Sequence, residues 1–302
     1  MMSSNEKLKT DHPSFLTMDP TMVTIFVGPE KKPHTVHMDL LTHYSDYFRA
    51  MFKGSFKEAE ERKTSMEDVQ DSLFGYFLDW LYHQTLPCPL SDCTLHPRPT
   101  RTINPGTKLS RAKKLDLVTR LYALGDQYEI PNLRRDAIDH IFYYYDRLEV
   151  VPDYRSVILA YDNLPEDSPL CQLLIDRYCR NGYRASVHDY GEDKELNKDG
   201  KLRSDLPYAF LLGMMIKGLG TIAHLVEGNE RKTGDVCDYH EHADDEERKK
   251  CKEEREARTM PTRIKTIETA TEVQAPTVNV PTPTPTRTQP SIRRWISKIP
   301  RF

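Results

Sequence analysis

Long apolar runs are missing from this 302-residue sequence. A helix that spans a bilayer needs about 18 or more consecutive apolar residues, and because no such stretch exists we expect no membrane span. Residues 1–15 also lack the apolar segment of a secretory signal. Without that signal, the six cysteines predict thiols in a reducing compartment, cytoplasmic or nuclear, rather than a disulfide framework.

Catalytic motifs are missing as well. The sequence has no Gly-rich phosphate loop and no G-x-S-x-G elbow. Cys171 and Cys179 fall in a segment with helical apolar spacing, which favours packed structural thiols over nucleophiles. The formal net charge of −3 excludes a uniformly basic surface, so no nucleic-acid partner is expected. We therefore predict a protein without enzymatic activity.

The apolar content is modest for a chain of this length. Hydrophobic residues make up 38% of the sequence and the mean hydropathy is −0.66, which predicts that part of the chain lies outside any core. One domain of about 100–200 residues would leave a large remainder. We predict a flexible N-terminus (1–18), a folded domain (19–147) with an inserted loop (87–113), a helical extension (148–258) and a disordered Thr/Pro-rich tail (259–302).

Strand signals are concentrated near the start of the chain. The β-branched and aromatic residues at 22–27 predict a strand. The Gly, Pro and charged residues that follow are turn-forming, so residues 34–37 are predicted as the second strand of a hairpin. Residues 63–66 are a candidate third strand. A small sheet of this kind needs helices to cover its apolar face.

Two short helices are predicted within residues 34–58, where apolar side chains recur at spacings of one, three and four. Ser45 lies between them and is a suitable N-cap for the second helix, while Gly54 is a suitable C-cap. A wide apolar face at residues 73–81 predicts the next helix, which Pro87 and the residue before it should end.

Helical spacing returns after residue 115. Apolar residues on one face predict a helix up to Tyr128, the Ile130-Pro131 pair interrupts it, and a second helix is predicted to start near Leu133. Three later segments have the same kind of spacing: 153–161, 169–180 and 206–219. The last of these is the most apolar, and we expect it to pack on the two before it.

These segments together resemble a known family. The order H-x-x-L, S-x-Y-F, M-F and F-x-E within residues 34–58 resembles the first helices of a BTB/POZ domain. The string LYALGDQYEIPNLRRDAIDHI at 121–141 looks like the last helix pair of that domain. The resemblance covers about residues 19–147 and implies an α+β fold, with a small β-sheet capped by a helical cluster. The segment Tyr82–Thr85 departs from it, since the family commonly has a Tyr-Thr-Gly turn there.

The later segments extend the resemblance. The order of a BTB domain, the string YDNLPEDSPLCQLLIDRYC and the string LPYAFLLGMM is similar to that of uncharacterised fungal BTB proteins with a helical C-terminal extension. The family resemblance implies association with a second copy or with another BTB protein through the N-terminal helices. The candidate interface residues are Leu40, Leu41, Tyr44, Phe48 and Met51. Some of them must instead serve the core of the domain, and the sequence does not separate the two sets.

The resemblance also implies a partner for the triplet Phe56-Lys57-Glu58. In BTB adaptors, an apolar residue two positions before an acid in this loop contacts the cullin scaffold of a ubiquitin ligase. An aromatic anchor beside a charge suits such a contact. The alternative is that Phe56 folds back on its own domain and Glu58 is simply solvated.

Two functions follow from the resemblance. The first is a substrate adaptor of a cullin-RING ubiquitin ligase, in which the extension (148–258) or the tail would bind an unknown substrate protein, since no kelch or MATH domain is recognised. The second is a non-catalytic oligomerising scaffold or transcriptional regulator that binds no cullin.

A Cys/His segment near the end of the chain is the stronger of two candidate metal sites, since the other, His83, Cys88, Cys93 and His96, lies in a loop with no convergent geometry implied. Cys237, His240, His242 and Cys251 follow the pattern C-x2-H-x-H-x8-C and supply the four ligands of a closed tetrahedral zinc site. The segment has few apolar residues, so a metal could supply folding energy that a core does not. The spacing is not that of a zinc finger. The alternative is a charged, poorly ordered segment in which these residues occur together by chance.

Overall fold

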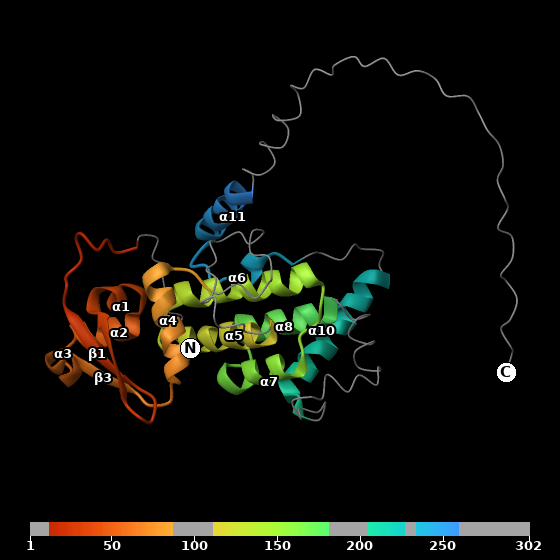
Figure 1. Ribbon diagram of the computed structural model, residues 1–302. Coiled ribbons are helices and arrows are strands. Elements are labelled where there is room, and N and C mark those ends of the chain that lie inside the picture. The colour runs from red at the N-terminus through yellow and green to blue at the C-terminus, as the bar shows by residue number, and fades with distance from the viewer. Residues whose placement is uncertain (1–11, 87–110, 181–204, 227–233, 260–302) are drawn as a thin grey trace, which may run out of the picture. The chain divides into compact units, whose positions relative to one another are not determined.

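The structure is a computed structural model of the whole chain (Figure 1). It describes residues 12–86, 111–180, 205–226 and 234–259. The chain divides into two units, 1–259 and 260–302, and the second unit lies wholly outside the described residues. The predicted disordered tail therefore lies outside them, apart from its first residue. The predicted loop lies outside them up to residue 110.

A three-stranded sheet forms as the strand signals predict. Strands β1 (Met22–Val27) and β2 (Lys32–His37) form an antiparallel hairpin, and β3 (Lys63–Met66) adds to the other side of β1 in parallel. The alternate β1 residues Val23, Ile25 and Val27 are buried, as expected for a strand with one face on the core. The fold is thus a small sheet combined with many helices, which confirms the predicted α+β class.

Ser45 separates the first two helices, α1 (Met38–Tyr44) and α2 (Asp46–Lys53), and caps the second. Its Oγ accepts a hydrogen bond from the backbone N–H of Phe48 at 3.0 Å, as the sequence predicts. The same hydroxyl donates to the carbonyl oxygen of Tyr128 at 2.7 Å. One buried side chain therefore caps α2 and also holds the α1–α2 junction against Tyr128, 83 residues further along the chain.

Gly54 ends α2 for a different reason than the sequence predicts. Its φ of −85° is open to any residue, so it is not a left-handed C-cap. A Cβ at this position would lie 2.4 Å from the carbonyl oxygen of Ala50. Glycine is therefore needed because it has no side chain, and its wider range of dihedral angles is not used. The short helix α3 (Lys57–Glu61) follows at once, and Phe56 is its N-cap residue.

Helix α4 (Asp71–His83) ends before Pro87, at Gln84 rather than at the predicted proline boundary. Gln84 has a φ of 52°, in the left-handed region that glycine adopts most easily. It is the third residue of the Tyr82–Thr85 segment, where the resembled family commonly has glycine. The turn after α4 therefore forms although this sequence has Gln84 where the resembled family commonly has glycine.

Helices α5 (Arg111–Gln127) and α6 (Pro131–Leu148) pack side by side across the centre of Figure 1. Glu129 adopts a φ of 50° between them and Pro131 occupies the first turn of α6, where its missing N–H costs nothing. The α4 residue Trp80 donates its Nε1–H to Asp136 of α6 at 2.8 Å, in the buried interior.

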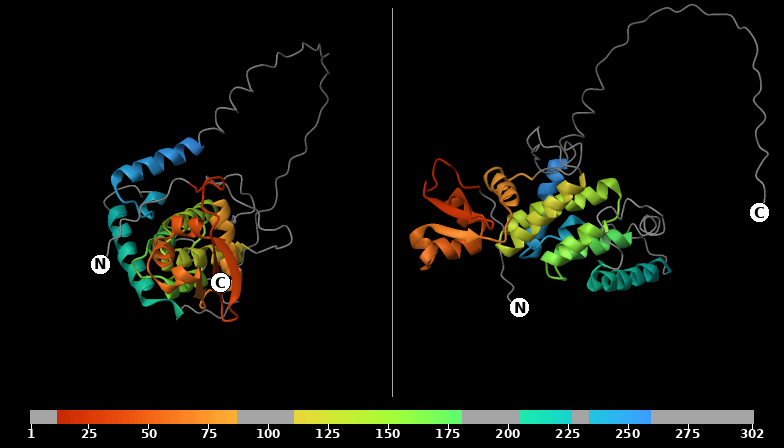
Figure 2. Two further views of the ribbon diagram at one scale, coloured as in Figure 1. Left: turned by 90° about the vertical axis from the view of Figure 1, so that its left-hand side faces the viewer. Right: turned by 60° about the horizontal axis from the view of Figure 1, so that its bottom comes forward.

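The extension begins with α7 (Tyr154–Asn163) and α8 (Pro169–Arg180), which pack on α5 and α6. Helix α10 (Tyr208–Val226) lies against α8, as predicted (Figure 2). The α10 residue Gly213 allows this approach, since a Cβ there would lie 2.4 Å from Cδ1 of Ile175. The buried apolar residues run without a break from the sheet to Phe210, so the extension shares the core of the first domain.

The last described elements are the 3-10 helix η2 (Val236–Asp238), which contacts α6, and α11 (Asp245–Thr259), which Figure 1 shows above α6. Among the described side chains of α11, Cys251 alone is buried. Within the described ranges, no helix combines the length and the apolar character that crossing a membrane requires.

Candidate metal centre and interaction surface

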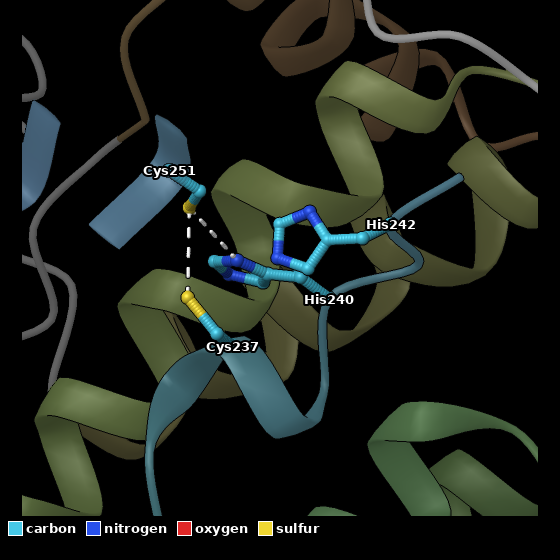
Figure 3. Close-up of side chains that lie close together, drawn as sticks. All are labelled: Cys237, His240, His242 and Cys251. Atoms are coloured by element: carbon cyan, nitrogen blue, oxygen red, sulfur yellow. Dashed lines mark hydrogen bonds between the residues drawn. The ribbon is translucent and has the colours of Figure 1, made fainter. Parts of the chain in front are cut away.

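The four predicted metal ligands come together in space. Cys237 lies in η2, Cys251 lies in α11, and His240 and His242 lie in the segment between them (Figure 3). One potential ligand atom from each residue lies within 4.8 Å of all the others. Both cysteines are buried, and the His240 side chain is 2% exposed.

The two contacts inside this Cys/His cluster are short. The Sγ atoms of Cys237 and Cys251 are 3.7 Å apart, and Sγ of Cys251 lies 3.5 Å from Nδ1 of His240. The Cys237 thiol donates to the sulfur of Cys251, which lowers the pKa of Cys251 and raises that of Cys237. The arrangement therefore already favours a thiolate at Cys251, the form in which cysteine binds a metal.

Asp139 of α6 fixes the orientation of the His240 ring. Its Oδ1 lies 2.8 Å from Nε2 of His240, so Nδ1 is the ring nitrogen directed at Cys251. Burial lowers the pKa of His240, but the hydrogen bonds with Asp139 and Cys251 outweigh that effect and the net pKa is raised. A carboxylate on the second nitrogen is the usual support of a metal-binding histidine.

His242 has no such support. Both of its ring nitrogens are buried and neither has a hydrogen-bond partner in the described part of the chain. Its ring lies edge-on to that of His240, with centroids 5.4 Å apart (Figure 3). Burial is the largest cause that lowers the pKa of His242, which keeps the ring neutral. A buried polar side chain without partners is costly, so this ring needs an explanation.

Polar contacts attach the cluster to the rest of the protein. Asp235 caps η2 and binds Arg255 of α11 through two hydrogen bonds of 2.7 and 3.0 Å. Tyr239 donates to Asp176 of α8 at 2.9 Å. Glu241 pairs with an α6 arginine at 2.9 Å. These contacts hold residues 235–241 against two helices of the core.

The other two described cysteines are not a reactive pair. Cys171 is fully buried in α8 and burial raises its pKa to about 11. Burial also raises the pKa of Cys179, whose sulfur contacts a backbone carbonyl of α10 at 3.7 Å. Both thiols stay protonated near neutral pH, which agrees with the structural role predicted for them.

The triplet Phe56-Lys57-Glu58 is presented at the surface. Phe56 is 59% exposed, so it does not fold back into the core. Lys57 and Glu58 form the first turn of α3 rather than the loop that the sequence predicts. Lys57 pairs with Glu61 at 3.2 Å and Glu58 is half-buried.

The predicted interface residues of the first helices lie inside the protein. Four of the five are 0–3% exposed and belong to the core of this chain: Leu40, Leu41, Tyr44 and Phe48. Met51 is half-buried against that core. These four side chains are therefore not available to a partner surface. The large apolar side chains that are exposed near the sheet are Phe15, Leu16, Met22 and Tyr47.

A second exposed apolar surface lies on α10, and sequence reasoning missed it. One side of the helix packs on α8, but the other carries six large apolar side chains that are 36–77% exposed. We call them the α10 patch: Tyr208, Leu211, Leu212, Met215, Ile216 and Leu219. The signal was present in the sequence, since a helix that is apolar all round must either be buried or offer a surface to a partner.

Comparison with known proteins agrees with the fold. The family model for the BTB/POZ domain matches residues 16–96. The human and mouse forms of "Kelch repeat and BTB domain-containing protein 4" are 38% identical to the chain over 62 residues, which is 20% of this chain and 12% of theirs. Mouse "Kelch-like protein 30" is 37% identical over 60 residues, or 20% and 10%. The match thus spans about an eighth of these relatives or less.

Residues 16–96 are a BTB/POZ domain, a module for binding other proteins. The chain therefore contains a BTB/POZ domain, as the motifs within residues 34–58 predict. The matched range ends before α5, so the assignment of residues 97–147 to the domain stays a prediction. The similarity to fungal BTB proteins also stays a prediction.

Proposed function

We propose that this protein is an adaptor that binds a cullin scaffold through its BTB domain and a second protein through its helical extension. The observation that carries the proposal is the exposure of Phe56 beside α2, at the start of α3. A phenylalanine with 59% of its surface in water gives up apolar burial that folding could have provided. A partner that covers the ring would recover it.

The neighbouring charges support the same reading. Lys57 is exposed and paired within its own helix, so it contributes little to a partner. Glu58 lies next to Phe56 on a helix whose first turn is acidic. An aromatic anchor at the centre of an interface typically contributes about 2 kcal/mol or more, whereas a charge at the rim mainly sets orientation and association rate.

The test is binding of purified full-length protein to purified cullin N-terminal domains, measured with Phe56→Ala and Phe56→Ala/Glu58→Ala. We expect the wild type to bind at least one cullin and the single variant to lose about tenfold or more, in line with an anchor contribution of about 2 kcal/mol. Tyr208→Ala is the matched control, since it removes another exposed aromatic far from α3. If the wild type binds no cullin, or if Phe56→Ala binds as well as the wild type, the proposal is wrong.

The second site of the adaptor is proposed to be the α10 patch. Monomeric proteins rarely leave several large apolar side chains exposed on one helix face unless a partner covers them. The patch lies on α10, at the opposite side of the folded unit from α3, the helix that Phe56 precedes (Figure 1). A target protein bound there would leave α3 accessible to the scaffold.

An oligomerising scaffold without cullin binding is the second candidate function. The observation that favours it is the exposure of Met22 and Tyr47, at 37% and 38%, beside the sheet and α2. These two side chains, rather than the buried set of α1 and α2, would then contact a second BTB domain. Light scattering after size-exclusion chromatography separates the two functions. A dimer that Tyr47→Glu dissociates, together with no cullin binding, supports the scaffold.

A further inference from the structure

We propose that Cys237, His240, His242 and Cys251 form a structural zinc site that fastens α11 to residues 237–242, which His240 connects to α6 through Asp139. This inference does not depend on cullin binding or on the α10 patch. It joins two parts of the chain, since Cys237, His240 and His242 precede α11 and Cys251 lies within it.

The spacing of the donor atoms fits a tetrahedral zinc ion. With Zn–S bonds of about 2.3 Å and Zn–N bonds of about 2.0–2.1 Å, the edges of the tetrahedron are about 3.8 Å for S–S and about 3.6 Å for S–N. The corresponding distances are 3.7 Å between the two sulfurs and 3.5 Å from Sγ of Cys251 to Nδ1 of His240. A disulfide would instead bring the sulfurs to about 2.05 Å.

The hydrogen bonding of the two histidine rings also supports a bound metal. His240 already has the carboxylate of Asp139 on Nε2, which leaves Nδ1 to bind the metal. His242 has two buried ring nitrogens without hydrogen-bond partners, and a metal ion would satisfy one of them. Coordination thus accounts for a buried polar ring that the protein contacts leave unpaired.

The attachment of α11 supplies a third, independent argument. Its sequence is almost wholly charged, and Cys251 is the one buried side chain among those described in the helix. Its contacts with the preceding segment include ion pairs of Arg255 and Lys252 with Asp235 and of Arg248 with Asp238, and capping hydrogen bonds at its first turn. Partly exposed ion pairs stabilise a structure only slightly. Structural zinc contributes far more, since small zinc-binding peptides do not fold without it.

The character of the site is structural rather than catalytic. Four protein ligands fill a tetrahedral zinc ion, whereas catalytic zinc keeps one position for water or substrate. Both sulfurs and the His240 ring are buried, so solvent has little access. The two thiols and two imidazoles favour zinc over magnesium or calcium, which prefer oxygen ligands.

The first experiment measures metal content in the full-length protein. The protein is purified without an affinity tag that binds metals and without chelator, and zinc is quantified by elemental mass spectrometry. We expect about one zinc ion per chain, as for a structural site, and a loss of at least tenfold in Cys251→Ser and His242→Ala. The matched controls are Cys179→Ser and His83→Ala, since these residues lie outside the Cys/His cluster and should keep the metal.

A second experiment remains informative if a ligand variant folds poorly. Wild-type protein is treated with a chelator and its backbone amides are followed by hydrogen exchange. We expect faster exchange in residues 236–256 after zinc removal, unchanged exchange in β1, and recovery when zinc alone is restored. Wild-type protein without zinc that takes up none when zinc is added, or zinc that the ligand variants keep, overturns the proposal. So does native protein isolated under reducing conditions with a Cys237–Cys251 disulfide.

Discussion

His240 contacts Asp139 across 2.8 Å, although the two residues are 101 positions apart in the chain. The contact joins the segment before α11 to the middle of α6, and the side chains of both residues are at most 8% exposed. Burying a charged pair costs desolvation free energy, and the attraction offsets that cost only when both side chains are held in good geometry. In this protein, the contact sets which ring nitrogen of His240 points toward Cys251.

The first prediction concerns that carboxylate. Asp139→Asn keeps the shape of the side chain but weakens its hold on the His240 ring. We expect zinc affinity to fall about 10- to 100-fold, as for other changes to residues that support a metal ligand, while zinc stoichiometry at saturation stays unchanged. Competition with a chromophoric chelator measures the affinity. Asp162→Asn, on the exposed side of α7, is the control. Equal affinity in wild type and Asp139→Asn would contradict the supporting role.

The second prediction concerns the junction between α1 and α2. Ser45→Ala removes a helix cap and a buried hydrogen bond to the carbonyl of Tyr128. We expect the free energy of unfolding to fall by about 1–3 kcal/mol, because an N-cap and a buried hydrogen bond each contribute about 1 kcal/mol. Urea denaturation measures the loss. The exposed Ser55→Ala should change the stability by less than about 0.5 kcal/mol. Equal losses of unfolding free energy in the two variants would show that the cap and the hydrogen bond of Ser45 do not stabilise the fold.

The third prediction is a dependence of stability on pH. Hydrogen bonds from Lys32 and His34 lower the pKa of Asp71 at the start of α4. A carboxyl group whose pKa is lowered by folding stabilises the protein above its unfolded pKa of about 3.9. That stability is lost as the pH falls through the lower, folded value. Between pH 5 and pH 3, the wild type should therefore lose more stability than Asp71→Asn.

Urea midpoints at several pH values test this expectation. Glu30→Gln, an exposed residue in the hairpin turn, is the control and should follow the wild type. Parallel curves for the wild type and Asp71→Asn would show that the ion pair with Lys32 and His34 contributes nothing to the folded state.

The fourth prediction concerns the α10 patch. Ile216 is 62% exposed, so Ile216→Glu should leave the free energy of unfolding within about 0.5 kcal/mol of the wild type. A charge at the centre of an apolar interface is costly, and we expect the variant to lose proteins that the wild type captures through the extension. Quantitative affinity capture from cell extract compares the two. Leu16→Glu, which changes an exposed leucine outside the α10 patch, is the matched control. A capture profile that Ile216→Glu leaves unchanged would remove the patch from the proposed function.

Local signals in the sequence were strong where one residue type decides the backbone. The hydroxyl of Ser45 can cap the helix that follows it, so the junction is readable from a few neighbours. Pro131 cannot continue a helix but can begin one, so the helix predicted to start near Leu133 starts two residues earlier, at Pro131. Gly54 is the C-cap of α2, as predicted, but the close carbonyl of Ala50 requires a glycine there, and its dihedral angles do not.

The sequence predicted which types of residue the candidate sites contain, but it did not predict which of those residues are exposed. Phe48 and Phe56 are both aromatic, yet the first is fully buried and the second is 59% exposed. Leu40 and Leu41 looked equally suited to an interface, but both belong to the core. Burial depends on every element that packs on a residue, including elements far away in sequence. A single segment therefore does not contain that information.

By itself, the sequence determined the kind of fold, the three strands, most helices up to α10 and the four residues of the Cys/His cluster, since these depend on local spacing and side-chain chemistry. Only the tertiary structure decided that Cys251 meets His240 and Cys237, because α11 must fold back beside α6 to bring them together. It also decided that Phe56 and the α10 patch are exposed. The physical reason is that a helix face becomes surface or core only when its neighbours are in place.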